Sequence, residues 1–135
     1  MLAIWRLHGV DEALRDAWQA GVVLAGWSAG AICWFEGGVT DSYGPELAAL
    51  DDGLGFLSGT FCPHYDSEAE RRVTYGRLVA EGLAAGYAAD DGVALHFRGT
   101  ELAEAVGSRS GGRAFRVERS GDGVTETAVP VRHLD

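Results

Sequence analysis

A serine between two glycines is the side chain of this chain best suited to act as a nucleophile. Ser28 is the centre of Gly-Trp-Ser-Ala-Gly at residues 26–30, after the apolar run 22–25 and before a further apolar segment. Strand, sharp turn and helix in that order are typical of a nucleophile elbow, whose backbone N–H groups face a developing oxyanion. The pattern predicts Ser28 as nucleophile and the N–H groups of Ala29 and Gly30 as oxyanion donors. The alternative is that Ser28 only caps a helix.

A serine hydroxyl is a weak nucleophile until a base takes its proton, and the base must itself be oriented by a third group. His64 is the best candidate for the base, because it follows a predicted strand and open α/β sheets bind ligands at strand ends. Asp41, Glu36 and Glu46 are the candidate acids, in that order. Asp41 is favoured because Val-Thr-Asp-Ser is a turn-forming setting in which neighbouring backbone and hydroxyl groups can hold a short carboxylate.

The elements expected to position these side chains begin with an amphipathic helix over residues 10–21, which leads into a strand over 22–25. Since that strand is apolar on both faces, it is typical of a central parallel strand covered by helices. Glycine-rich stretches at 36–45 and 51–59 predict loops, and 60–62 a short strand. Ser67 and Glu70 match a capping box for a helix that runs to about residue 84.

The rest of the chain has the pattern of short strands separated by turns. We expect strands at 87–89, 93–97, 101–106, 113–118 and 124–131, with hairpin-type turns such as Asp91-Gly92 between them. The predicted fold is therefore a single α/β domain over residues 1–135. Its mainly parallel sheet is sandwiched by helices, and antiparallel strands are added at the C-terminal end.

Composition argues against several classes of partner. The net charge is −9, from 20 acidic residues against 11 basic ones, and without lysine or a basic stripe the chain is a poor candidate for nucleic-acid binding. It has neither an apolar run long enough to cross a membrane nor a leader peptide, so we expect a cytoplasmic protein that binds no membrane. Cys33 and Cys62 are expected to be buried thiols. The histidines show no metal-ligand spacing, so no metal or other cofactor is expected.

Several of these motifs together resemble the peptidase E family, the aspartyl dipeptidases grouped with cyanophycinase as S51 serine peptidases. The resemblance is carried by residues 26–36, 40–42, 61–64 and 87–92. It implies a fold similar to the class I glutamine amidotransferases, a Ser-His-Asp or Ser-His-Glu triad, and cleavage of dipeptides that begin with aspartate. Ser28 then corresponds to the nucleophile and His64 to the base.

For the other roles the resemblance leaves alternatives. Asp41 matches the aspartate version of the triad after a small gap, but family members differ in where the acid lies. In the family, an arginine on the helix after the catalytic histidine binds the substrate carboxylate, which implies Arg72 or Arg71 here. An arginine suits this role because its guanidinium holds a carboxylate in a two-pronged fork.

Compared with the family pattern, the chain begins inside the domain, just after a Gly-Gly-Asn-Thr-like loop that helps form the oxyanion and substrate sites. This N-terminally shortened form predicts a homo-oligomer, or another chain, that fills the gap, or else feeble activity. The leading functional prediction is a serine dipeptidase for Asp-X dipeptides. The alternatives are a catalytically silent homologue that acts as a binding or assembly subunit, and a small-molecule hydrolase or acyltransferase with the same elbow.

Overall fold

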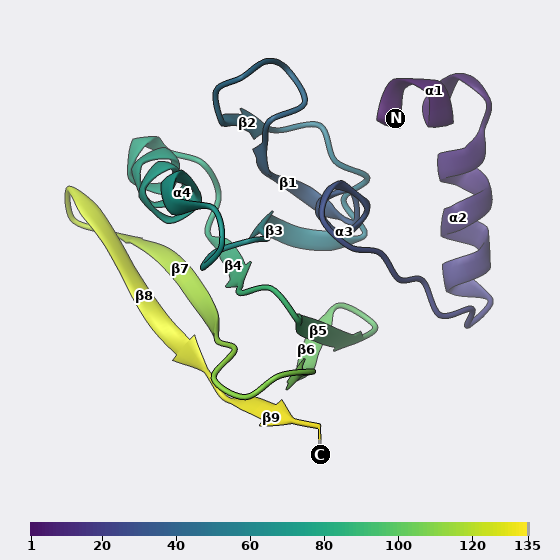
Figure 1. Cartoon of the computed structure of the whole chain (residues 1–135). Helices are drawn as coiled ribbons and strands as arrows, with labels where there is room; N and C mark the ends of the chain where they lie inside the picture. Colours follow the sequence, from purple (N-terminus) through teal and green to yellow (C-terminus); the bar gives the residue numbers. More distant parts are fainter. Residues whose placement is uncertain (135) are drawn as a thin grey trace.

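Three helices open the chain, three strands and a fourth helix follow, and strands alone come after that last helix (Figure 1). The computed structural model describes residues 1–134, so the predicted single domain 1–135 ends one residue outside the described range and stays a prediction. The architecture is α/β, as predicted. The helices are α1 (Leu2–Leu7), α2 (Val10–Gln19), α3 (Ala29–Ile32) and α4 (Ala69–Glu81), and the strands are β1 (Phe35–Thr40), β2 (Ala48–Leu50), β3 (Leu57–Cys62), β4 (Gly86–Ala89), β5 (Val93–Arg98), β6 (Glu101–Gly107), β7 (Ala114–Ser120), β8 (Gly123–Val129) and β9 (Val131–His133).

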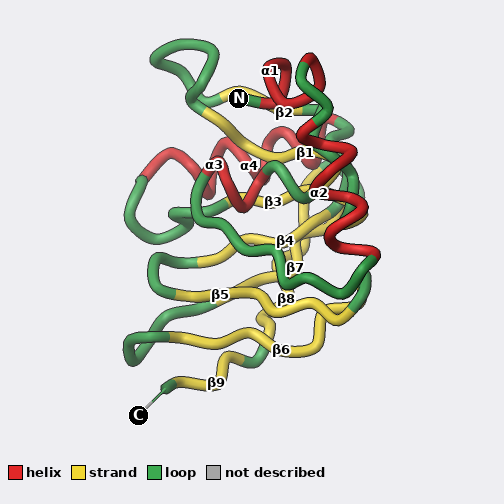
Figure 2. The backbone as a smooth tube through the Cα atoms, turned by 90° about the vertical axis from the view of Figure 1, so that its right-hand side faces the viewer, coloured by secondary structure: helices red, strands yellow, loops and turns green. Residues whose placement is uncertain are grey.

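A six-stranded sheet in the order β2-β1-β3-β4-β7-β8 forms the centre of the molecule. Its middle strands β1, β3 and β4 run parallel, with Phe61 opposite Gly38 on one side and Tyr87 on the other. The remaining pairs of this sheet are antiparallel. A second sheet, β5-β6-β9, lies beyond β4 (Figure 2). The parallel core with antiparallel strands toward the C-terminus agrees with the predicted fold class.

Helices cover both faces of the six-stranded sheet (Figure 1). On one face α4 packs Tyr75 and Val79 into a core with Cys62 and Val117. On the other face Ile32 of α3 packs with Phe35 and Phe61, whose rings stack with centroids 5.4 Å apart. Successive side chains of a strand point to opposite faces, so β3 contributes Phe61 to one core and Cys62 to the other.

The predicted strand at residues 22–25 does not form. The chain there is extended but unpaired, and Val23 is 89% exposed. A strand needs a neighbouring backbone to satisfy its N–H and C=O groups, and no described strand lies beside this segment. The sequence pattern indicates a local preference for strand conformation, but it does not indicate whether another strand will lie beside the segment.

The predicted loop at 36–45 is also wrong in its first half, because residues 35–40 form β1. Its glycines allow close strand pairing: a Cβ at Gly38 would lie 2.3 Å from the Phe61 carbonyl oxygen, and one at Gly37 would lie 2.2 Å from that of Leu50. Glycine density here reflects backbone approach inside a sheet, and not a turn.

The other predicted elements are found with shifted ends. The amphipathic helix is α2, and the five predicted C-terminal strands are present, the last divided into β8 and β9 at Pro130, which has no N–H to donate to a ladder. The helix α4 begins without the predicted capping box. Its N-cap residue is Glu68, which makes no capping hydrogen bond and instead pairs with Arg71.

Candidate active site

The backbone around Ser28 has the sharp bend of an elbow. Ser28 has φ 50° and ψ −125°, values that a residue with a side chain adopts only when its surroundings enforce them. The bend brings residue 26 against residue 30, and a Cβ at Gly26 would lie 2.0 Å from the Gly30 carbonyl oxygen. Gly30 itself faces open space. Of the two glycines in the motif, the one before the serine is therefore the one that the fold requires.

His64 lies where the chain leaves β3, and it also has a positive φ, of 58°. Its Nε2 is 2.9 Å from Ser28 Oγ, and its Nδ1 is 2.6 Å from Asp91 Oδ1. A neutral ring that carries its proton on Nδ1 donates to the carboxylate and leaves Nε2 free to accept the serine proton. The three side chains thus form a hydrogen-bonded series with the geometry of a serine-hydrolase triad.

The carboxylate on His64 is Asp91, which the sequence reasoning did not propose. Asp91 follows β4, and β4 runs parallel beside β3, so the two side chains leave the sheet at the same edge. The Ser67 side chain and the His64 ring lower the pKa of the Asp91 carboxyl, which keeps it ionised. From the sequence, Asp91-Gly92 is interpreted as a hairpin-type turn and as part of the motif 87–92 that resembles peptidase E, without a catalytic role. Its place at the carboxyl end of a strand was the signal that could have found it.

The acids predicted from the sequence lie elsewhere. Asp41 turns toward Arg71 of α4, 3.8 Å away, on the face of the sheet opposite α3. Glu36 accepts a 2.7 Å hydrogen bond from the backbone N–H of Gly59, and Glu46 is exposed. The prediction that one of them orients His64 is wrong in this structure. Local turn chemistry could not reveal which face of the sheet a loop carboxylate would reach.

The two predicted oxyanion donors differ in their surroundings. The N–H of Gly30 already donates to the Trp27 carbonyl at 2.9 Å. The N–H of Ala29 has no backbone acceptor within the described part of the chain. Ala29 directly follows Ser28, the position that supplies one oxyanion donor in nucleophile elbows. The structure therefore leaves one of the two groups available.

Neither predicted substrate-binding arginine lines the cavity beside Ser28. Arg71 is a buried residue of α4. Its guanidinium pairs with Glu68 and donates to the Val39 carbonyl at 3.1 Å. Arg72 pairs with Glu126 of β8. Both guanidinium groups are thus held by carboxylates of the chain itself.

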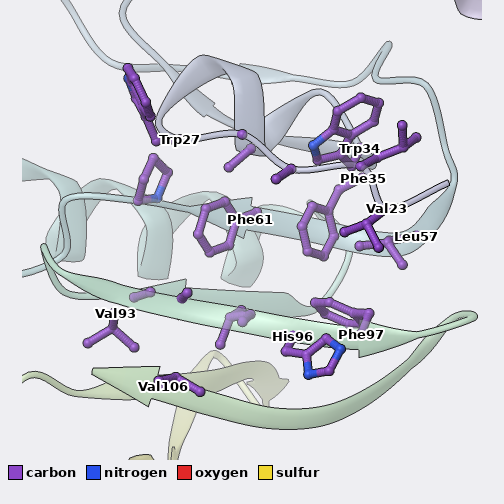
Figure 3. Close-up of a pocket in the computed structure, with 18 of the residues that line it drawn as sticks. Val23, Trp27, Trp34, Phe35, Leu57, Phe61, Val93, His96, Phe97 and Val106 are labelled. Atoms are coloured by element: carbon purple, nitrogen blue, oxygen red, sulfur yellow. The ribbon is translucent and has the colours of Figure 1, made fainter. Parts of the chain in front are cut away.

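A cavity of about 940 Å³ opens beside the triad, and Ser28, His64 and Asp91 all line it. It lies between the extended segment 22–27, the face of the main sheet that carries Phe35 and Phe61, and the second sheet (Figure 3). Its lining is mostly apolar, which suits a site that excludes water from a polar reaction. Within residues 1–134, no group of three or more His, Cys, Asp or Glu side chains is placed to hold a metal ion.

Ser28, His64 and Asp91 therefore form a hydrogen-bonded series beside an α/β sheet, with Ser28 just before α3, His64 just after β3 and Asp91 just after β4. A sequence model of Peptidase family S51 matches residues 1–105, and the chain belongs to that family. It is similar to the uncharacterized peptidase YgaJ of Bacillus subtilis (strain 168), with 53% identity over 135 residues that cover 99% of this chain and 58% of YgaJ. The chain thus spans less than two thirds of that relative's length. No solved structure matches it.

None of the helices in the described range is long and apolar enough to cross a membrane.

Proposed function

We propose that this protein is a serine peptidase that hydrolyses Asp-X dipeptides. The observation that carries the proposal is the series from Ser28 Oγ through His64 to Asp91, with hydrogen bonds of 2.9 and 2.6 Å. Membership of the S51 peptidases supports peptide hydrolysis as the reaction. The motifs that resemble peptidase E support a substrate whose first residue is aspartate.

The reaction follows from the positions of these groups. His64 Nε2 takes the hydroxyl proton as Ser28 Oγ attacks the scissile carbonyl carbon, and Asp91 stabilises the imidazolium that results. The Ala29 N–H donates to the carbonyl oxygen as it becomes an oxyanion. His64 then gives its proton to the departing amine, which leaves an acyl ester on Ser28. Water, deprotonated by His64, cleaves that ester and releases aspartate.

Binding of the substrate's own carboxylate requires a guanidinium that is free to pair with it. Arg71 and Arg72 are each paired with a glutamate of the chain, so either one would have to exchange that partner for the substrate. Comparing aspartyl with alanyl and leucyl p-nitroanilides tests the preference directly. A kcat/KM for the aspartyl compound at least tenfold above the other two supports an aspartate pocket. Equal values leave a peptidase of different specificity.

The triad is tested by three variants assayed on aspartyl p-nitroanilide. Ser28→Ala should remove hydrolysis. Asp91→Asn should lower kcat by about 10³- to 10⁴-fold, because the amide favours the wrong histidine tautomer. The matched control is Asp41→Asn, which should stay within about twofold because Asp41 does not contact His64. Hydrolysis that survives in Ser28→Ala at the original rate would refute the proposal.

One observation favours a second candidate, an assembly subunit that works as a homo-oligomer. The unpaired segment 22–27 exposes 89% of Val23 and 88% of Trp27, an apolar surface of the kind that marks interfaces. Light scattering should then give a mass of two or more chains, and Val23→Glu should shift it toward one chain. A monomer at high protein concentration would exclude this candidate.

A further inference from the structure

The triad carboxylate lies in an exposed turn, where little would be expected to hold it still. Asp91 is in the three-residue connection 90–92 between β4 and β5, and its side chain is 47% exposed, against 28% for His64. A carboxylate in such a position has solvent on one side and competing water molecules around it. Its hydrogen bond to His64 is reliable only if the backbone of the turn is fixed.

Two charged side chains hold both polar groups of the Asp91 peptide backbone. The Asp91 N–H donates to Asp66 Oδ1 at 2.9 Å. The Asp91 carbonyl accepts from Arg109 Nε at 2.7 Å. The ring is closed by the ion pair between Arg109 Nη2 and Asp66 Oδ2. We refer to Asp66 and Arg109, with these three contacts, as the Asp66–Arg109 clamp.

The clamp ties together the two loops that carry the base and the acid. Asp66 lies in the turn just after His64, and Arg109 lies in the loop between β6 and β7. The same loop holds the next residue of the turn, because Ser108 donates to the Gly92 carbonyl from its N–H at 2.8 Å and from its hydroxyl at 3.0 Å. His64 and Asp91 are therefore connected twice, once through their own hydrogen bond and once through the clamp.

We propose that Asp66 and Arg109 are positioning residues that hold Asp91 against His64, an inference that rests on the proposed function. Neither contacts the reacting atoms, so each acts through Asp91. Burial opposes ionisation of Asp66, but the hydrogen bonds from the Asp91 N–H and from Arg109 outweigh it and lower the pKa of its carboxyl. The clamp is consequently charged on both sides near neutral pH.

The kinetic prediction separates positioning from binding. Arg109→Ala should lower kcat on aspartyl p-nitroanilide by about tenfold and leave KM within about twofold, because a misplaced acid affects the transition state and not substrate binding. Arg109→Lys should recover only part of the loss, since an ammonium does not reproduce the fork that reaches both Asp91 and Asp66. Asp66→Asn should be milder than Asp66→Ala, because the amide oxygen can still accept from the Asp91 N–H.

The matched control is Arg77→Ala. Arg77 is also an exposed arginine paired with a carboxylate, Glu81, but that pair lies along α4 and contacts no triad residue. It should leave kcat and KM unchanged. Melting curves by circular dichroism should show that Arg109→Ala and Arg77→Ala are both folded, as expected for arginines whose side chains are 52% and 54% exposed.

A double-variant cycle shows whether the clamp acts through the Asp91 side chain. In the Asp91→Ala background no carboxylate remains to be positioned, so adding Arg109→Ala should change kcat by less than about twofold. A further tenfold loss in that background would show that Arg109 acts on something else, and would overturn the proposal. An Arg109→Ala single variant with unchanged kcat would overturn it equally.

A spectroscopic measurement keeps the clamp testable even if the chain does not cleave the dipeptide substrate. The proton that His64 Nδ1 donates to Asp91 should give a downfield ¹H NMR signal, assigned by its loss in Asp91→Ala. The signal should also disappear or broaden in Arg109→Ala and persist in Arg77→Ala. If Arg109→Ala keeps it as sharp as the wild type, the clamp does not position Asp91. If the wild type shows the signal without hydrolysis, the proposed function fails and the clamp stands.

Discussion

At Gly26 the chain itself occupies the space that a side chain would need. A Cβ there would lie 2.0 Å from the Gly30 carbonyl oxygen, whereas one at Gly30 would meet nothing within 4 Å. Gly26→Ala should therefore shift the elbow and lower kcat on aspartyl p-nitroanilide by at least about 10²-fold, the effect of a displacement near 1 Å at a reacting group. Gly30→Ala should retain activity within a few fold. Equal losses in the two variants would contradict this steric assignment.

Asp66 gives the fold a dependence on acid pH. Because the pKa of its carboxyl is lowered from an ordinary value of 3.8, its contribution to stability is complete above that value. The contribution is lost as pH falls through the lowered pKa of the folded state. The difference in free energy of unfolding between wild type and Asp66→Asn should be constant above about pH 5 and shrink below about pH 4. Urea titrations across this range measure it, and a difference that grows toward acid pH would be inconsistent with a lowered pKa.

Two of the three residues in the hydrogen-bonded series could be predicted from the sequence, and the third could not. Ser28 and His64 each stand in a local pattern, a glycine-flanked turn and a strand end after proline, and the structure brings them together. Asp91 has no comparable local signature, since an Asp-Gly pair between apolar runs is typical of any hairpin. Its role depends on which strand lies beside β3, and strand order is a property of the whole fold.

Among the elements, α4 is held to the sheet by two adjacent arginines with very different surroundings. Arg71 is 2% exposed and satisfies Glu68 and the Val39 carbonyl, while the Arg72 side chain is 46% exposed and stacks at 5.2 Å over Phe115. Arg71→Ala should lower the free energy of unfolding by about 3 kcal/mol, because it leaves a carboxylate and a buried carbonyl unpaired. Arg72→Ala should cost about 1 kcal/mol. Urea unfolding distinguishes the two, and equal costs would mean that burial does not set the difference.

The elements show two reasons why a sequence pattern can mislead. Residues 22–25 have strand propensity, but a strand exists only with a partner, and none of the described strands lies beside them. Gly37 and Gly38 look like loop residues, yet they are in β1 because neighbouring backbone leaves no room for side chains. Periodicity gave α2 and the C-terminal strands correctly, since those elements depend on a repeated local pattern.

On the scale of the whole molecule, the fold class could be predicted because alternation of helices and parallel strands followed by hairpins has few packing solutions. The meeting of two sheets at one cavity could not be predicted from the sequence. It depends on the direction that the chain takes between β4 and β5, and on the pairing of β9 with β6. Segment 22–27, which forms one wall of the cavity, exposes the large apolar side chains of Val22, Val23 and Trp27.

The rate at which the two cysteines are alkylated can report local opening of the structure around the site. Cys33 directly follows α3, on the nucleophile side, and Cys62 is the last residue of β3, two residues before His64; they are 1% and 0% exposed. Burial raises the pKa of the Cys33 thiol to about 11 and that of Cys62 to about 12, so neither reacts with an alkylating reagent until its surroundings open. The rate of labelling therefore measures opening, separately on each side of the triad.

Since α3 is a single turn while β3 is a central strand between two others, Cys33 should be labelled well before Cys62. Mass spectrometry of iodoacetamide-treated protein over time gives both rates. Equal rates would mean that the nucleophile and the base are released only when the whole molecule unfolds.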